Sequence, residues 1–142
     1  TLNKTAAEVM NRHGVRACTD ITGFGLLGHL CRMMMESASG AEIDFDSLPL
    51  LPDVADYAKA GIYSGANERN ASFVAGEVAF AKHLGPEQQA ILYDAQTSGG
   101  LLMAVPADRA TAVLSDLHAS GVAAARAIGR ITAAGSPRIR VR

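Results

Sequence analysis

The chain has 142 residues, of which 49% are hydrophobic and 19% charged, and its formal net charge is −1. These values are ordinary for a globular protein of one domain, and the near-neutral charge excludes the basic surface that marks a nucleic-acid-binding protein. Charged residues interrupt every apolar run far short of the ~20 residues needed to span a bilayer, and the polar start TLNKT does not resemble a signal peptide.

Hydrophobic periodicity and the positions of glycines predict four helices and strands in the first 45 residues. They are a helix that ends at Gly14, a short strand over 15–19, an apolar helix over 23–37 and a half-buried strand over 41–45. In the apolar helix, Leu27, Leu30, Cys31 and Met34 recur at helical spacing and define one buried face.

The remainder of the chain predicts helices and strands in alternation. They are a helix from Pro52 through Tyr57, a loop with the sequence GIYSGANERN, helices over 71–82 and 86–94, a QTSGG loop, a strand over 101–105, a helix from Ala110 to Gly121, and strands over 126–132 and 137–141. The apolar run Leu101–Val105 indicates a central strand, with Leu27, Leu30 and Met34 packed toward it. We expect an α+β fold in which helices pack on one mixed β-sheet.

Several features favour structural interpretations. Arg138, Arg140 and Arg142 alternate with apolar residues, which is typical of the exposed face of an edge strand. Cys18 and Cys31 lack CxxC spacing, which indicates two small core residues in a reducing, cytoplasmic protein. The four histidines lack metal-ligand spacing, which argues against a zinc site, and the residues indicate no nucleophile–base pair.

The stretch TDITGFGLLGHL places Asp20 just before two glycines and an apolar helical pattern. Two interpretations remain open. Asp20 or Thr22 could cap the helix, a contribution of about 1 kcal/mol that the spacing alone favours. Alternatively, Asp20 binds Mg²⁺, which needs only one or two carboxylates when phosphate oxygens and water complete its coordination. Gly23 and Gly25 would then let a phosphate approach the helix N-terminus without an intervening Cβ.

Two other loops could contact an anion. QTSGG, residues 96–100, could hold one with backbone N–H groups, although such a stretch is more often a tight turn. GANERN, residues 65–70, offers Arg69 and Asn70, which could reach a nucleotide or pair with a neighbouring carboxylate. The spacing does not assign a role to either loop. His29, on the apolar helix, is expected to be a partly buried histidine with its hydrogen bonds satisfied.

The segments ACTDITGFGLLGHL, GANERN and DAQTSGGLLMAV, in this order and at these separations, resemble the C-terminal half of selenophosphate synthetases (selenide, water dikinases). The resemblance extends over essentially the whole chain, and TDITGFGLLGHL is its most specific element. These enzymes belong to the aminoimidazole-ribonucleotide-synthetase-like superfamily. The resemblance therefore implies that residues 1–142 form the single C-terminal domain of a longer, two-domain enzyme.

The resemblance also implies an activity: ATP, selenide and water give selenophosphate, AMP and phosphate, with Mg²⁺ required. In the family, the reactive Cys or selenocysteine and most metal-binding aspartates lie in the N-terminal domain. We therefore expect no catalytic residue in this chain, no activity from it alone, and a homodimeric complete enzyme. Asp20 matches the metal-binding aspartate of the motif, and Thr19, Thr22, Gly23 and Gly25 match residues that line the phosphate side.

Two positions depart from the family pattern. Ala95 stands where the family usually has proline, which leaves the turn possible but less rigid. Ala66 replaces a second glycine, which weakens the case for a close backbone contact there. The alternative hypothesis is a non-catalytic module that binds an anion or a partner and uses these loops only as turns.

Overall fold

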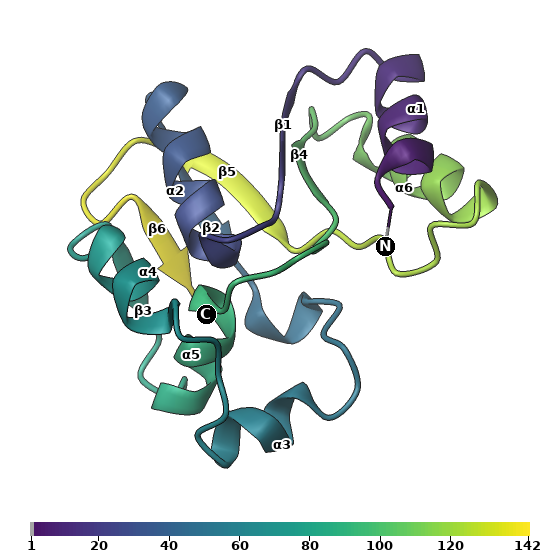
Figure 1. The fold of residues 1–142 in the computed structure, drawn as a ribbon. Coiled ribbons are helices and arrows are strands. Elements are labelled where there is room, and N and C mark those ends of the chain that lie inside the picture. The colour runs from purple at the N-terminus through teal and green to yellow at the C-terminus, as the bar shows by residue number, and fades with distance from the viewer. Residues whose placement is uncertain (1) are drawn as a thin grey trace.

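The computed structural model describes residues 2–142, in which helices and strands follow one another in mixed order (Figure 1). The elements are α1 (Lys4–Arg12), β1 (Ala17–Asp20), α2 (Gly25–Glu36), β2 (Ser39–Ile43), the 3-10 turn η1 (Phe45–Ser47), α3 (Val54–Lys59), α4 (Asn67–Phe73), β3 (Val78–Phe80), α5 (Pro86–Tyr93), β4 (Leu101–Ala104), α6 (Ala110–Ala119), β5 (Gly129–Ala133) and β6 (Ile139–Val141). This content confirms the α+β class. No helix among residues 2–142 combines the length and apolarity that a membrane span requires.

Four strands form a mixed sheet in the order β3–β6–β2–β5. β6 runs parallel to both of its neighbours, and β5 pairs with β2 in the antiparallel sense. The prediction that the segment with Arg138, Arg140 and Arg142 forms an edge strand is therefore wrong, because β6 lies between β3 and β2. Ile139 and Val141 are buried while Arg140 is exposed. Their alternation correctly identified the exposed face, but a strand with one exposed face can have neighbours on both edges.

The other two strands, β1 and β4, form a separate two-stranded antiparallel sheet. The prediction that Leu101–Val105 forms a central strand is thus wrong, since β4 has a single neighbour and its residues are only partly buried. The apolar run has another cause. Leu102 packs against the cluster around α2, whereas Leu101 and Met103 pack against a second cluster between α1 and α6. Both faces of β4 are covered by helices, so both are apolar.

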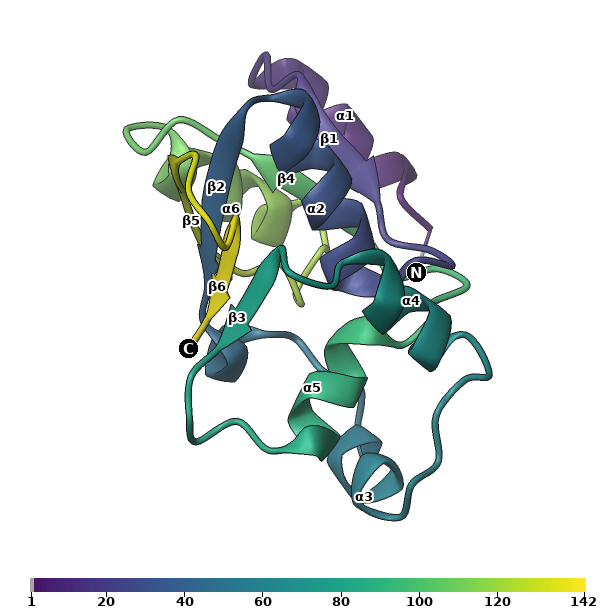
Figure 2. The same ribbon diagram turned by 90° about the vertical axis from the view of Figure 1, so that its left-hand side faces the viewer.

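The hydrophobic core has two parts. The larger cluster lies between α2 and the four-stranded sheet, which Figure 2 shows side by side, and it buries Leu27, Leu30 and Met34 almost completely. This confirms the predicted apolar face of α2, and Leu102 meets it from β4. The smaller cluster joins α1 to α6, which lie side by side (Figure 1), through residues such as Val9 and Leu117. Full burial of each such side chain contributes about 1.5–3 kcal/mol.

Two local predictions were wrong. The expected helix over 71–82 does not form: α4 begins earlier, inside the GANERN segment that was expected to be a loop, and ends at Phe73. Gly76 then adopts a φ of +82°, which breaks helical geometry, and the chain enters β3. Cys31 is buried as expected, but the prediction of a core position is wrong for Cys18, which is exposed.

Asp116 on α6 ties α6 to the end of α1. Arg12 Nη2 donates a hydrogen bond of 3.0 Å to Asp116 Oδ2, and His13 Nε2 lies 3.1 Å from the same oxygen. The Arg12 hydrogen bond, with a smaller contribution from His13, lowers the pKa of Asp116 below its usual value. A carboxylate with a lowered pKa stabilises the folded state above its unfolded pKa, and this contribution disappears as the pH falls through the folded pKa.

We therefore expect Asp116→Asn to weaken the acid sensitivity of the fold. The urea midpoint of the wild-type chain should fall as the pH drops below about 4, the ordinary pKa range of aspartate, and the variant's midpoint should fall less. Asp108→Asn is the matched control, because Asp108 is an exposed aspartate outside the contact between α1 and α6, and it should keep the wild-type pH dependence. Identical acid profiles for wild type and Asp116→Asn would contradict the assignment.

Candidate functional site

The loop that follows β1 is bonded to the QTSGG motif. The Ile21 N–H donates to the Gly100 carbonyl at 2.9 Å, and the Gly99 N–H donates back to the Ile21 carbonyl at 3.0 Å. One residue further along, the Thr22 carbonyl accepts the Gln96 N–H at 3.0 Å. QTSGG therefore extends the pairing of β1 with β4 past the end of both strands, and the two motifs form one backbone unit.

Asp20 is the last residue of β1, and its side chain is exposed. Within residues 2–142, no side chain forms a hydrogen bond or ion pair with its carboxylate. α2 begins at Gly25, and no side chain of the described residues caps its N-terminus. The capping interpretation is therefore wrong for both Asp20 and Thr22. The carboxylate is left available to a cation, and no structural role competes for it.

His29 on α2 holds the loop from the helix side. Its Nε2 atom accepts a hydrogen bond of 3.1 Å from the Thr22 N–H and lies 3.1 Å from the Thr22 hydroxyl, while Nδ1 lies 3.5 Å from Thr19 Oγ1. Because Nε2 accepts the backbone N–H, the neutral ring carries its proton on Nδ1. This confirms the partly buried, hydrogen-bonded histidine. It also explains why two threonines flank Asp20: both hydroxyls meet the same imidazole.

Asn70 joins the GANERN motif to the loop between β1 and α2. Its side-chain Nδ2 donates to the Gly23 carbonyl at 2.9 Å and to the Tyr93 carbonyl at 2.8 Å. Its neighbour Arg69 is exposed. Sequence reasoning left the role of Asn70 open, and no local pattern identifies it, because both acceptors are backbone atoms far away in the chain. The structure thus gathers all three motifs around one loop.

The two glycines of the loop have different surroundings. Gly25 is buried with a φ of +68°, and a Cβ there would lie 2.7 Å from the Tyr93 carbonyl carbon and oxygen and 2.9 Å from the Asp94 oxygen. Glycine at this position therefore has a packing reason that is independent of any ligand. Gly23 is exposed, and a Cβ there would have no described heavy atom within 4 Å. Of the two, Gly23 is the one that leaves space for a ligand.

The turn after α5 is fixed by the loop before α4. Asp94 Oδ1 accepts the Ser64 N–H at 3.0 Å, and Asp94 Oδ2 accepts Gln96 Nε2 at 3.2 Å. The Ala95 N–H donates to Ser64 Oγ at 3.3 Å, a bond that the family's usual proline could not make. Ala66 has a φ of −87°, an ordinary value that needs no glycine. Both departures from the family pattern are thus accommodated without strain.

The side chains around the loop that could act as metal ligands are too few to hold a metal ion alone. Residues 2–142 contain no group of three or more His, Cys, Asp or Glu side chains that could hold a metal ion. Asp20 can supply one ligand, so the others must come from a bound phosphate, water or another part of the protein. This fits Mg²⁺, which commonly uses one or two carboxylates together with substrate phosphates, and does not fit a site built from this chain alone.

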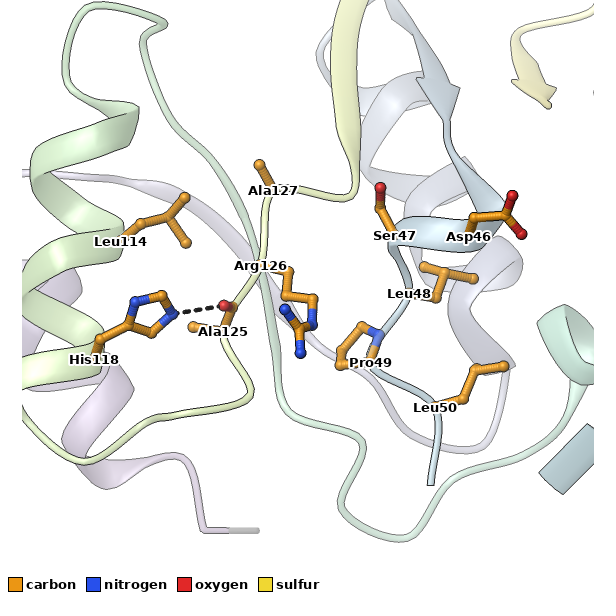
Figure 3. A pocket seen from close by; sticks show the side chains of 10 residues that line it. All are labelled: Asp46, Ser47, Leu48, Pro49, Leu50, Leu114, His118, Ala125, Arg126 and Ala127. Atoms are coloured by element: carbon orange, nitrogen blue, oxygen red, sulfur yellow. Dashed lines mark hydrogen bonds between the residues drawn. The ribbon is translucent and has the colours of Figure 1, made fainter. Parts of the chain in front are cut away.

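An open groove of about 620 Å³ lies elsewhere in the molecule, between α6 and residues 46–50. Figure 3 shows Leu114 and His118 on one side, with Arg126 between them and Pro49; His118 Nε2 donates to the Ala125 carbonyl at 2.8 Å. None of the residues that line this groove belongs to the three motifs. This groove is therefore separate from the candidate site, the loop between β1 and α2 where the three motifs meet.

Comparison with known proteins matches the whole chain, residues 1–142, to the family model described as "AIR synthase related protein, C-terminal domain". The chain is 46% identical over 121 residues to the "Selenide, water dikinase" of Porphyromonas gingivalis, which covers 85% of the chain and 34% of the relative. It is 43% identical over 143 residues to the protein of the same name from Myxococcus xanthus, covering 99% of the chain and 40% of the relative. The match to the Agathobacter rectalis protein of that name is 42% over 130 residues, with 92% and 37% covered. The chain thus spans well under half the length of these relatives.

The contrast between the two glycines can be tested by measuring stability. We expect Gly25→Ala to lower the free energy of unfolding by about 1–3 kcal/mol, because it forces a side chain into a positive-φ position and against the Tyr93–Asp94 backbone. Gly23→Ala is the control and should stay within about 0.5 kcal/mol of wild type. Urea unfolding of both variants measures the difference, and equal stabilities would contradict the observed packing of α2.

Proposed function

We propose that this chain, which belongs to the AIR synthase related C-terminal domain family, is the C-terminal domain of a selenide, water dikinase. The proposal rests mainly on its identity of 42–46% over most of its length to the three proteins of that name. The complete enzyme converts ATP, selenide and water into selenophosphate, AMP and phosphate. Asp20, which has no structural partner in the described residues, supports a role for this domain in binding the metal and the phosphates.

In this proposal the loop forms one wall of the ATP cleft. Asp20 supplies one carboxylate oxygen to Mg²⁺, and carboxylates of the preceding domain, phosphate oxygens and water supply the rest. When bound, Mg²⁺ neutralises charge on the phosphates during transfer. Thr19 and Thr22 fix the backbone on either side of Asp20 through His29. Gly23 lets a phosphate oxygen approach the backbone, while Gly25 keeps the start of α2 against the turn after α5.

The preceding domain supplies the reactive Cys or selenocysteine and covers the loop. Phe24 and Phe73 support such a cover: their rings stack with centroids 5.5 Å apart, and each side chain remains about half exposed beside the loop. Interfaces between domains of one chain bury surfaces of this apolar kind. The complete enzyme is a homodimer in this proposal, and it works in the cytoplasm, which the two free cysteines support.

The first test uses the chain by itself. Because the nucleophile and most metal ligands are assigned to the preceding domain, we expect the purified chain to release no AMP from ATP, with or without selenide. The measurement is chromatography of adenine nucleotides after incubation with Mg²⁺. Selenide-dependent release of AMP by this chain alone would contradict the division of roles.

The second test uses Asp20→Asn in the complete enzyme. No hydrogen bond to the carboxylate is lost within residues 2–142, so the melting temperature should stay within a few degrees of wild type. Activity should fall at least about a hundredfold, equivalent to ~2.7 kcal/mol in the barrier, because a hard cation held by few carboxylates depends on each one. Raising Mg²⁺ should recover part of the loss.

Asp108→Asn is the matched control for this experiment, since it removes an exposed carboxylate from a turn outside the three motifs. It should leave turnover and Mg²⁺ dependence unchanged. Near-normal turnover of Asp20→Asn at ordinary Mg²⁺ would mean that Asp20 does not bind the metal, and would favour a non-catalytic role for the loop.

A further inference from the structure

Asn70 stands out because it is the one buried polar residue among residues 2–142, with 1% of its surface exposed. A buried carboxamide destabilises a fold unless its hydrogen bonds are made. Here the Nδ2 group makes two, to the carbonyls of Gly23 and Tyr93. These acceptors lie 47 and 23 residues away along the chain. Asn70 therefore joins two segments that the sequence separates widely.

The orientation of the carboxamide is fixed by its acceptors. Turning it over would place Oδ1 against two carbonyl oxygens, so the observed orientation is the one that both carbonyls accept. In this orientation Oδ1 is buried and has no partner in the described residues. A buried acceptor without a partner is destabilising, so apolar packing alone would not favour an asparagine at this position. The two donated hydrogen bonds are thus the reason for an asparagine here.

The two carbonyls belong to two different segments that meet at the candidate site. The Gly23 carbonyl belongs to the loop between Asp20 and α2, and the Tyr93 carbonyl belongs to the backbone against which Gly25 packs. Other bonds hold Ile21 and Thr22, through the QTSGG backbone and His29. Among the described residues, Asn70 is the partner of the Gly23 carbonyl. The path of the loop beyond Thr22 therefore depends on Asn70.

We propose that Asn70 is a positioning residue for the Asp20 site: its carboxamide fixes the loop after β1 to the turn after α5, so that Asp20 and the open backbone at Gly23 face one metal–phosphate group together. This inference rests on the proposed function. Asn70 touches neither metal nor phosphate. It acts through the Gly23 carbonyl, and a displacement of about 1 Å in such a loop is enough to lower a rate a hundredfold.

The experiment compares Asn70→Ala with Asn67→Ala in the complete enzyme. Asn67 lies on the same helix, where it donates to the Ala90 carbonyl at 2.9 Å and accepts from Ser64 Oγ at 3.4 Å. Its removal therefore takes away a carboxamide that makes no hydrogen bond to the loop after β1. For Asn70→Ala we expect the Mg²⁺ concentration at half-maximal activity to rise at least about tenfold, the scale of one lost hydrogen bond. Asn67→Ala should lose some stability and keep the wild-type Mg²⁺ dependence.

Two readouts do not require turnover. Affinity for Mn²⁺ in the presence of ATP, followed by electron paramagnetic resonance, should weaken in Asn70→Ala and stay unchanged in Asn67→Ala. Amide hydrogen exchange over residues 21–26 should accelerate in Asn70→Ala alone. The same Mg²⁺ dependence, Mn²⁺ affinity and exchange rates in both variants would overturn the proposal. A wild-type enzyme without selenide-dependent turnover would instead refute the proposed function, while hydrogen exchange would still test the contact.

If Asn70→Ala does not fold, the wild-type protein supplies the test. The side-chain amide protons of Asn70, observed by NMR in asparagine-labelled complete enzyme, should exchange far more slowly than those of exposed Asn11. Slow exchange, together with a resonance shift when Mg²⁺ and ATP are added, supports the proposal. Exchange as fast as that of Asn11, or no response to Mg²⁺ and ATP, overturns it.

Discussion

The candidate site depends on the close contact between the backbone at the start of α2 and the backbone of Tyr93 and Asp94. This approach is possible because Gly25 has no side chain and adopts a positive φ. It brings the loop after β1 within reach of the turn after α5, so that Asn70 can donate to both segments. The backbone bonds of QTSGG then complete the arrangement. Each of the three motifs alone is a weak indication of function, and this contact brings them together at one candidate site.

The same contact explains how much of the site the sequence could predict. Asp20, Thr22 and the glycines stand in one stretch, so their proximity follows from covalent connectivity. The approach of Asn70 and of Gln96 does not, because it depends on how α4 and α5 pack against α2. Local spacing favoured a cap at Asp20, since the periodic apolar pattern placed the helix start near Gly23. The helix starts two residues later, at Gly25, out of reach of either side chain.

The errors in the predicted fold have a common physical origin. Period-two alternation reports which face of a strand meets the core, and a continuous apolar run reports that both faces are covered. Neither pattern reports how many strands lie alongside. β6 therefore resembled an edge strand although it has two neighbours, and β4 resembled a central strand although it has one. The helices were placed more accurately, because the apolar periodicity of a helix depends less on which elements pack against it. The exception was the predicted helix over 71–82, which Gly76 interrupts.

The interior position of β6 also constrains how the protein can be made. Its residue Ile139 pairs with Ala41 on one side and with Val78 on the other. During synthesis, β2 and β3 therefore wait with unpaired edges until nearly one hundred further residues have followed β2 out of the ribosome. Pairing at such separation slows folding, and open edges invite pairing with other nascent chains. The buried residues of the α1–α6 cluster have all emerged once Leu117 has, so this cluster can form earlier. The β1–β4 pair, whose residues Leu101 and Met103 pack against this cluster, can thus be supported before the four-stranded sheet closes.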